Sequence, residues 1–350
     1  VPANPEPANP EPANPRGVRA VNIETDLIPP NAIIKKYPKN PAERVEVVNC
    51  FKKGDIIFTT QKVFFLNPVS CLQFLFKLLR IRWPFNETQY NHAAIVVKVD
   101  KTKNIVLVAD IVTTKGSTPR VYDILTNYSS RLGFNSTYKV IRSRDVTTHQ
   151  KIDGQESFLE RVAAVADRMG VMNGNLTKQL GLTATKTNKK VTNPGFGYKE
   201  GFKAIVYGPQ TNVSSSLKMQ LFQQIYDEHV KNTVSTSGPK PRKFFCSYFI
   251  AHVLQQVEAY RAFIELTKTA AGVALLNSLN ILIEQVKNQS GAEKSRIIHE
   301  WTMKSAGQYG EALWQKMQRF KFNPETMAPG ALEAQLERDD NFAVVLHIRG

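Results

Sequence analysis

The most constraining feature of the sequence is a pair of apolar runs separated by a short polar segment. Residues 93–99 read AAIVVKV, residues 105–112 read IVLVADIV, and the sequence DKTKN lies between them. Two apolar runs of strand length that flank a polar loop are typical of a β-hairpin. We therefore predict that the chain builds a compact, mostly antiparallel sheet around this hairpin.

Other short apolar runs predict further strands of the same sheet. They are residues 45–48 and 56–58, around the turn Lys53-Gly54-Asp55, then residues 138–141 and, as a closing strand, residues 342–348. Because each run is only a few residues long and is bounded by polar residues, strands are favoured over helices here.

Helical periodicity marks other parts of the chain. The predicted helices cover residues 155–169, 217–230, 246–257 with a continuation and a break before residue 286, and 292–302. Strands and helices are grouped rather than regularly alternating. The predicted fold class is therefore α+β, with an antiparallel sheet packed against helices.

The chain is predicted to have an N-terminal arm and one domain. Its first sixteen residues, VPANPEPANPEPANPR, repeat Pro-Ala-Asn-Pro-Glu with a period of five. Proline fixes φ and removes backbone donors, so an extended arm is expected. We assign residues 1–40 to this arm and residues 41–350 to a single domain with a helical insertion around residues 258–320.

The balance of charge invites an anionic partner. There are 46 Lys and Arg against 30 Asp and Glu, a formal net charge of +16. An anionic membrane surface is one candidate, because residues 64–81 are strongly apolar and end in basic residues. A buried helix explains the same segment. Nucleic acid is not favoured, since basic residues do not interleave with aromatic ones along a strand.

Cysteine usage points to one thiol. Three cysteines, Cys50, Cys71 and Cys246, allow at most one disulfide, which excludes a disulfide-stapled scaffold. Cys246 stands where a basic loop meets a predicted helix. Unpaired N–H groups and the positive end of the helix dipole favour a thiolate at such a position. The alternative is a small apolar residue buried in the first helical turn.

A histidine and an aspartate belong to the predicted hairpin. His92 comes directly before the first strand, and Asp110 interrupts the apolar run of the second. A carboxylate in such a run is costly without a partner. If the hairpin forms, Asp110 can lie across from His92 and orient its imidazole. The alternative is that Asp110 faces water.

The order of these segments resembles the circularly permuted, NlpC-type branch of the papain-like cysteine hydrolases and acyltransferases. The resemblance rests on GDIIF at residues 54–58, NHAAIVV at 91–97, the strand at 105–112, FCSYFI at 245–250 and the tail from MAPGAL at 327–332 onward. In this branch the histidine precedes the cysteine, as it does here.

The resemblance implies roles for individual residues. Cys246 matches the nucleophile, His92 the general base, and Asp110 the residue that orients the histidine, with Asp145 as the fallback for that third position. Tyr90 and Ser247 are candidates for the oxyanion hole or for substrate binding. The chain departs from the family where Ser247-Tyr248 replaces the usual Ser-Glu pair, and in its long helical stretch at residues 258–287.

The chemistry that follows is nucleophilic catalysis through a thioacyl intermediate. Hydrolysis of a peptide or amide is the first choice. The alternative is Nε-fatty acyl transfer to lysines of membrane-associated proteins, as some secreted bacterial effectors of this fold perform, and secretion from a bacterium is favoured over a periplasmic location. No cofactor or metal is expected, and acyl-CoA is a co-substrate only for a transferase. A non-catalytic module that binds anionic surfaces is the second alternative.

Overall fold

The computed structural model describes most of the chain between residues 31 and 349. The described residues are 31–60, 90, 92–111, 120–125, 137–144, 151–152, 156–169, 171–172, 201, 203–204, 208–219, 221–222 and 245–349. The predicted arm before residue 31, the apolar segment at residues 64–81 and most of the predicted helix at residues 217–230 lie outside them.

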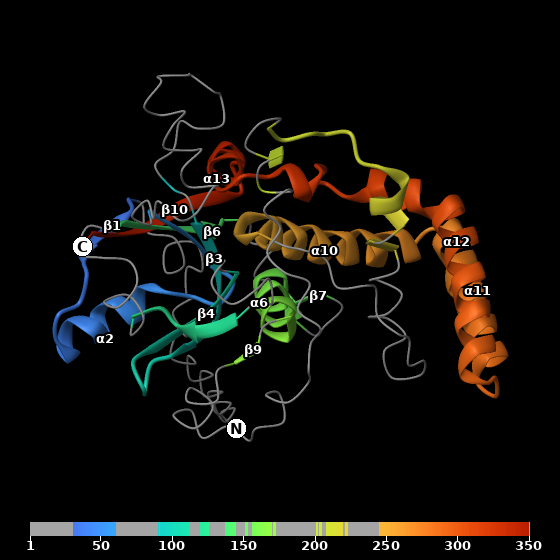
Figure 1. The fold of residues 1–350 in the computed structure, drawn as a ribbon, viewed down its shortest axis with the longest axis horizontal. Coiled ribbons are helices and arrows are strands. Elements are labelled where there is room, and N and C mark those ends of the chain that lie inside the picture. The colour runs from blue at the N-terminus through green and yellow to red at the C-terminus, as the bar shows by residue number, and fades with distance from the viewer. Residues whose placement is uncertain are drawn as a thin grey trace, which may run out of the picture.

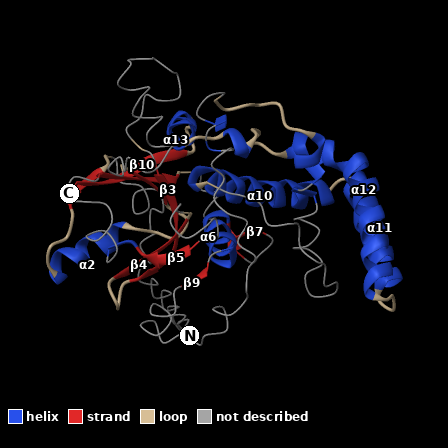
Figure 2. Cartoon of the chain, viewed as in Figure 1, coloured by secondary structure: helices blue, strands red, loops and turns tan. Residues whose placement is uncertain are grey.

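An eight-stranded sheet organises the described part of the molecule (Figure 1, Figure 2). Its order is β1-β10-β6-β2-β3-β4-β5-β9, and neighbours pair antiparallel except at its two edges, β1 with β10 and β5 with β9. The strands are β1 (Ile33–Lys36), β2 (Ile56–Thr59), β3 (His92–Asp100), β4 (Ile105–Asp110), β5 (Arg120–Asp123), β6 (Thr137–Ser143), β9 (Val171–Met172) and β10 (Phe342–Arg349). A separate two-stranded ladder joins β7 (Lys151–Ile152) to β8 (Glu156–Ser157).

The predicted hairpin is confirmed. β3 pairs antiparallel with β4, and a turn at residues 101–104 joins them. Asn104 adopts a positive φ of 53°, a conformation that asparagine tolerates better than most residues. The strands predicted at residues 56–58, 138–141 and 342–348 are also present, as β2, β6 and β10. β1 was not predicted, and it lies within the range assigned to the arm.

The strand predicted at residues 45–48 is wrong, because these residues belong to helix α2 (Pro41–Cys50). Asn40 caps the helix by accepting a hydrogen bond from the backbone N–H of Glu43, at 2.9 Å, and Pro41 occupies the first turn. The Glu43 carboxylate accepts in return from the backbone N–H of Lys39. These start signals outweigh the β propensity of the valines, of which Val47 and Val48 are buried.

Helices cover the sheet and extend beyond it. They are α6 (Phe158–Met169), α10 (Cys246–Thr267), α11 (Ala270–Val286), α12 (Gly291–Lys316), the short 3₁₀ helix η3 (Pro324–Thr326) and α13 (Pro329–Arg338). The predicted break before residue 286 falls at Lys268 and Thr269, where Thr269 caps α11 by accepting from the N–H of Gly272. The helix predicted at residues 292–302 is longer and runs to Lys316.

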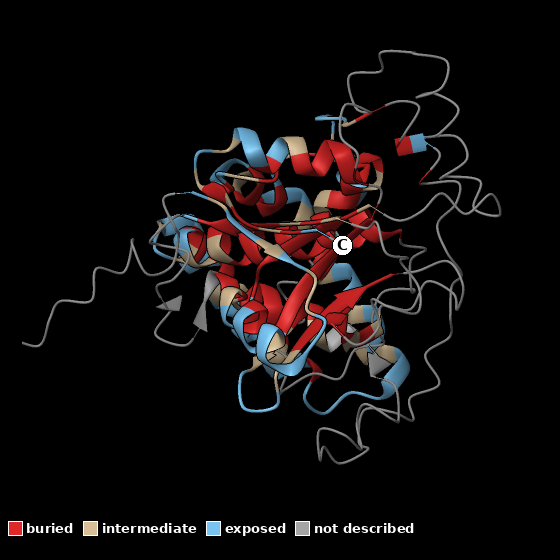
Figure 3. Cartoon of the chain, turned by 90° about the vertical axis from the view of Figure 1, so that its left-hand side faces the viewer, coloured by how far each residue is buried: buried red, intermediate tan, exposed pale blue. Residues whose placement is uncertain are grey.

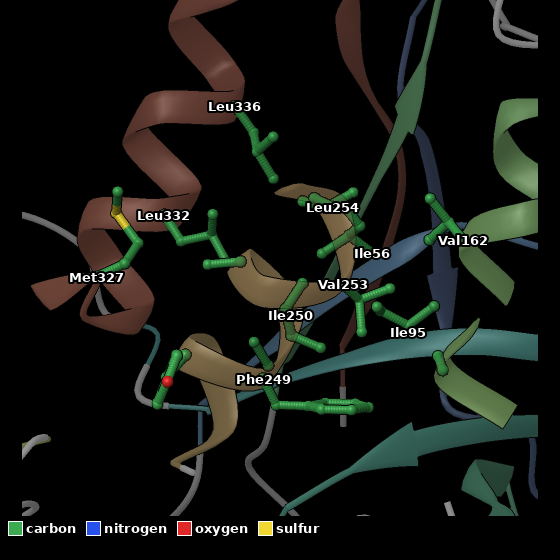
Figure 4. Close-up of a cluster of buried hydrophobic side chains, with 14 of the residues drawn as sticks. Ile56, Ile95, Val162, Phe249, Ile250, Val253, Leu254, Met327, Leu332 and Leu336 are labelled. Carbon is green, nitrogen blue, oxygen red and sulfur yellow. The ribbon is translucent and has the colours of Figure 1, made fainter. Parts of the chain in front are cut away.

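The core has a layer on each side of the sheet. On one side β2, β3 and β4 pack against α6, α10 and α13, and the close-up in Figure 4 shows Phe249, Ile250, Val253 and Leu254 of α10 directed into this layer. On the other side α2 covers the sheet. Figure 3 shows the buried residues concentrated where strands and helices meet. The described fold is thus α+β, with α10 as its central helix.

The helices after residue 258 form a layer of their own. Apolar side chains of α10, α11 and α12 share one cluster, and α11 and α12 share a second. In Figure 1, α11 lies at the far end of α10 from β1. This part of the chain therefore extends the N-terminal half of α10 without covering the strands that carry His92 and Asp110.

Candidate active site

The N-terminus of α10 presents Cys246 in the first helical turn. Phe245 precedes it in an extended conformation and contributes no side-chain cap. The first intrahelical bond runs from the N–H of Phe249 to the carbonyl of Phe245, so the helix itself provides no carbonyl for the N–H groups before Phe249. The Cys246 side chain, only 7% exposed as a residue, therefore lies at the positive end of a 22-residue helix.

The hairpin brings His92 and Asp110 together. Ile95 pairs with Ala109, which places the first residue of β3 and the last residue of β4 at the same end of the ladder, diagonal to one another. The Nε2 atom of His92 lies 2.8 Å from Oδ2 of Asp110, and both residues are buried. The contact expected if the hairpin formed is therefore present, and Asp110 does not face water.

His92 also contacts Cys246. Burial lowers the pKa of His92, but the negative charge and hydrogen bond of the Cys246 sulfur, together with the Asp110 carboxylate, outweigh it and raise that pKa to about 10. Nε2 is engaged by Asp110, so Nδ1 is the nitrogen left to donate to sulfur. The three residues form a continuous Cys246–His92–Asp110 relay at one end of the sheet.

Two residues that the sequence analysis did not single out complete this cluster. Arg120 lies directly opposite Asp110 in the β4–β5 ladder, and its Nε donates to Oδ1 of Asp110 at 2.7 Å. The Tyr122 hydroxyl donates to Oδ2 at 2.7 Å. Burial raises the pKa of Asp110, but the His92 and Arg120 partners lower it to about 2. The available signal was the alternation of RVYD, which puts both polar side chains on one face of a strand.

The two oxyanion candidates have different surroundings. The hydroxyl of Ser247 donates to the backbone carbonyl of Met327 at 2.7 Å, so its hydrogen anchors α10 to the segment before α13. Tyr90 is buried in the core layer, and the ammonium of Lys139 lies 5.0 Å from its ring centroid. Asp145, the fallback for the third position, lies outside the described residues.

Cys50 differs from Cys246. It is half-buried near the end of α2, and its sulfur donates to the backbone carbonyl of Glu46 at 3.3 Å. Burial raises the pKa of the Cys50 thiol, which disfavours its thiolate. Cys71 lies outside the described residues. Between the two described cysteines, only Cys246 has an imidazole partner, so Cys50 is an internal reference for thiol reactivity.

Two further features were searched within the described ranges. They hold no group of three or more His, Cys, Asp or Glu side chains placed to ligate a metal ion. No single described helix has the length and hydropathy of a membrane-spanning segment, although α10 and α11 pass that test as a pair bent by 102°.

The chain was compared with protein-family models, curated proteins and solved structures, and nothing matched it. The chemistry of the site is therefore argued from its own geometry and from the order of its residues.

The contact between His92 and Cys246 predicts a measurable pKa. Because the folded-state pKa of His92 lies above its ordinary value of 6.5, this proton stabilises the fold fully below pH 6.5, and the contribution is lost as pH rises through about 10. In Cys246→Ser the sulfur charge is absent, and the His92 pKa should fall by about 1 to 3 pH units. NMR titration of the imidazole measures this, and an unchanged His92 pKa would contradict the contact.

Proposed function

We propose that the protein is a cysteine-nucleophile enzyme that forms a thioacyl intermediate on Cys246. One observation carries the proposal: a thiol at the N-terminus of a buried helix contacts an imidazole whose far nitrogen is 2.8 Å from a buried carboxylate. Nucleophile, base and orienting group in this sequence are the arrangement that activates a thiol.

The permuted papain-like fold is part of the same proposal. Two features support it. The nucleophile helix packs against an antiparallel sheet whose strands β3 and β4 supply His92 and Asp110. The histidine precedes the cysteine by 154 residues (246 − 92), as in the NlpC-type branch.

The mechanism follows from the atoms in place. The Cys246 thiolate attacks a carbonyl carbon, forming a C–S bond, and the backbone N–H groups of the first turn of α10 stabilise the oxyanion. The His92 imidazolium then donates a proton to the leaving group as its bond to the carbonyl carbon breaks. Neutral His92 next takes a proton from the acceptor, which attacks the thioester and releases sulfur. Asp110 holds the ring in the required orientation throughout.

Water is the first choice of acceptor, which makes the enzyme a peptide or amide hydrolase. A lysine amine is the alternative, with a fatty acyl-CoA as the donor. The surroundings of the thiol favour this alternative: Cys246 is nearly buried and its helix neighbours Phe245 and Tyr248 lie in the apolar core layer. Exclusion of water lengthens the life of a thioester and allows an amine to compete.

Intact-mass spectrometry tests the proposal. The protein is incubated with acyl-CoAs and with a peptide library, and a covalent acyl adduct is expected on the wild type and on the control variants Cys50→Ala and Cys71→Ala. Cys246→Ala should carry none. The mass of the adduct identifies the donor. Absence of any adduct, together with equal alkylation of Cys246 and Cys50, would support the non-catalytic module for anionic surfaces instead.

A further inference from the structure

Asp110 is held by more donors than the orientation of a histidine requires. Its Oδ2 accepts from His92 at 2.8 Å, from the Tyr122 hydroxyl at 2.7 Å and from Nη2 of Arg120 at 3.2 Å, while Oδ1 accepts from Nε of Arg120 at 2.7 Å. Asp110 has no exposed surface. The carboxylate is therefore fixed in plane by a two-pronged guanidinium contact before His92 is considered.

The guanidinium of Arg120 is itself fixed. Its carbon lies 4.3 Å from the ring centroid of Tyr122, so the cation stacks on the residue whose hydroxyl binds the same carboxylate. β5 holds the pair in place, because Arg120 lies opposite Asp110 and Tyr122 is two residues further along the same strand. Side chains at this spacing lie on one face of a strand.

We propose that Arg120, supported by Tyr122, is a positioning residue that keeps Asp110 charged and aimed at Nε2 of His92. The inference rests on the proposed function of Cys246 and His92 and extends it to a residue that touches neither substrate nor nucleophile. A buried carboxylate without a cation favours its protonated form, and a protonated Asp110 no longer stabilises the imidazolium. The positive charge of Arg120 thereby sustains the thiolate–imidazolium pair under acidic conditions.

The test is the pH dependence of Cys246 alkylation by iodoacetamide, followed by peptide mass spectrometry. In Arg120→Met, the midpoint of the acid limb should rise by about 1 to 2 pH units. The rate at pH 5 should therefore fall about tenfold or more, whereas the rate at pH 8 should change little. Arg120→Lys keeps the charge and should restore at least half of the shift.

A matched variant separates positioning from stability. Arg44 forms the same kind of pair with Asp123 of the same strand, with Nη2 2.5 Å from Oδ2, and the Arg44 and Arg120 side chains are 25% and 24% exposed. Arg44→Met should lower thermal stability much as Arg120→Met does and leave the acid limb of Cys246 in place. An unmoved acid limb in folded Arg120→Met would overturn the proposal.

Tyr122→Phe keeps the test decisive if Arg120→Met does not fold. It removes one donor to Oδ2 and should move the acid limb in the same direction by a smaller amount, and an unmoved limb would again count against the proposal. Failure of the proposed function is recognised separately, when wild-type Cys246 reacts no faster than Cys50. The ¹³C resonance of the Asp110 carboxyl still reports whether Arg120 controls its protonation.

Discussion

Replacing His92 with alanine is expected to slow the alkylation of Cys246 about a hundredfold at pH 6. The imidazolium stabilises the sulfur anion, and the raised pKa of His92, about 10, keeps the ring protonated at this pH. An isolated cysteine thiol, with a pKa of about 8.5, is less than about 1% thiolate at pH 6. The loss should shrink toward pH 9, where any thiol ionises without help.

The experiment compares the wild type, His92→Ala and His347→Ala with iodoacetamide from pH 5 to 9. His347 lies half-buried on β10 and serves as the control, because that strand is separated from β3 by β6 and β2. Cys50 reports the intrinsic reactivity of the reagent in every sample. Equal rates at Cys246 in the wild type and in His92→Ala at pH 6 would refute activation by the imidazole.

The second large effect concerns a buried ion pair away from the thiol. Arg142 of β6 donates from Nε to Oδ1 and from Nη2 to Oδ2 of Asp55, both at 2.7 Å, and also donates to the carbonyl of Cys50 at 2.8 Å. Burial raises the pKa of Asp55 despite the favourable effect of Arg142. The pair joins the end of α2 to two central strands.

Asp55→Ala should lower the free energy of unfolding by about 3 to 5 kcal/mol, because it leaves the Arg142 guanidinium buried without its counterion. Urea denaturation followed by circular dichroism measures this change. Replacing both partners, as in Asp55→Leu with Arg142→Met, should recover much of the loss, since no uncompensated charge then remains.

The exposed pair between Lys35 and Glu46, at 2.8 Å, is the matched control for this stability test. Glu46→Ala should leave the urea midpoint almost unchanged, because solvent screens exposed ion pairs. A midpoint for Asp55→Ala that equals the one for Glu46→Ala would show that the buried pair contributes no more than a surface contact.

Much of the sheet was predictable because its strands carry local signals. The β3–β4 hairpin has two apolar runs and a polar turn within twenty residues, so its register follows from short-range pattern alone. That register brings Asp110 to His92. The failure at residues 45–48 has the opposite cause: three valines suggest a strand, whereas Asn40, Pro41 and Glu43 supply a helix start that decides the conformation.

The order of the chemical groups along the chain and the residue types at the hairpin and at the start of α10 could be recognised from the sequence by itself. Only the tertiary structure decided that Cys246 contacts His92, and that Arg120 and Tyr122 bind Asp110. The reason is that these contacts join separate segments of the chain. Their geometry depends on how the core packs α10 and β5 against the hairpin, and no local pattern of residues specifies that packing.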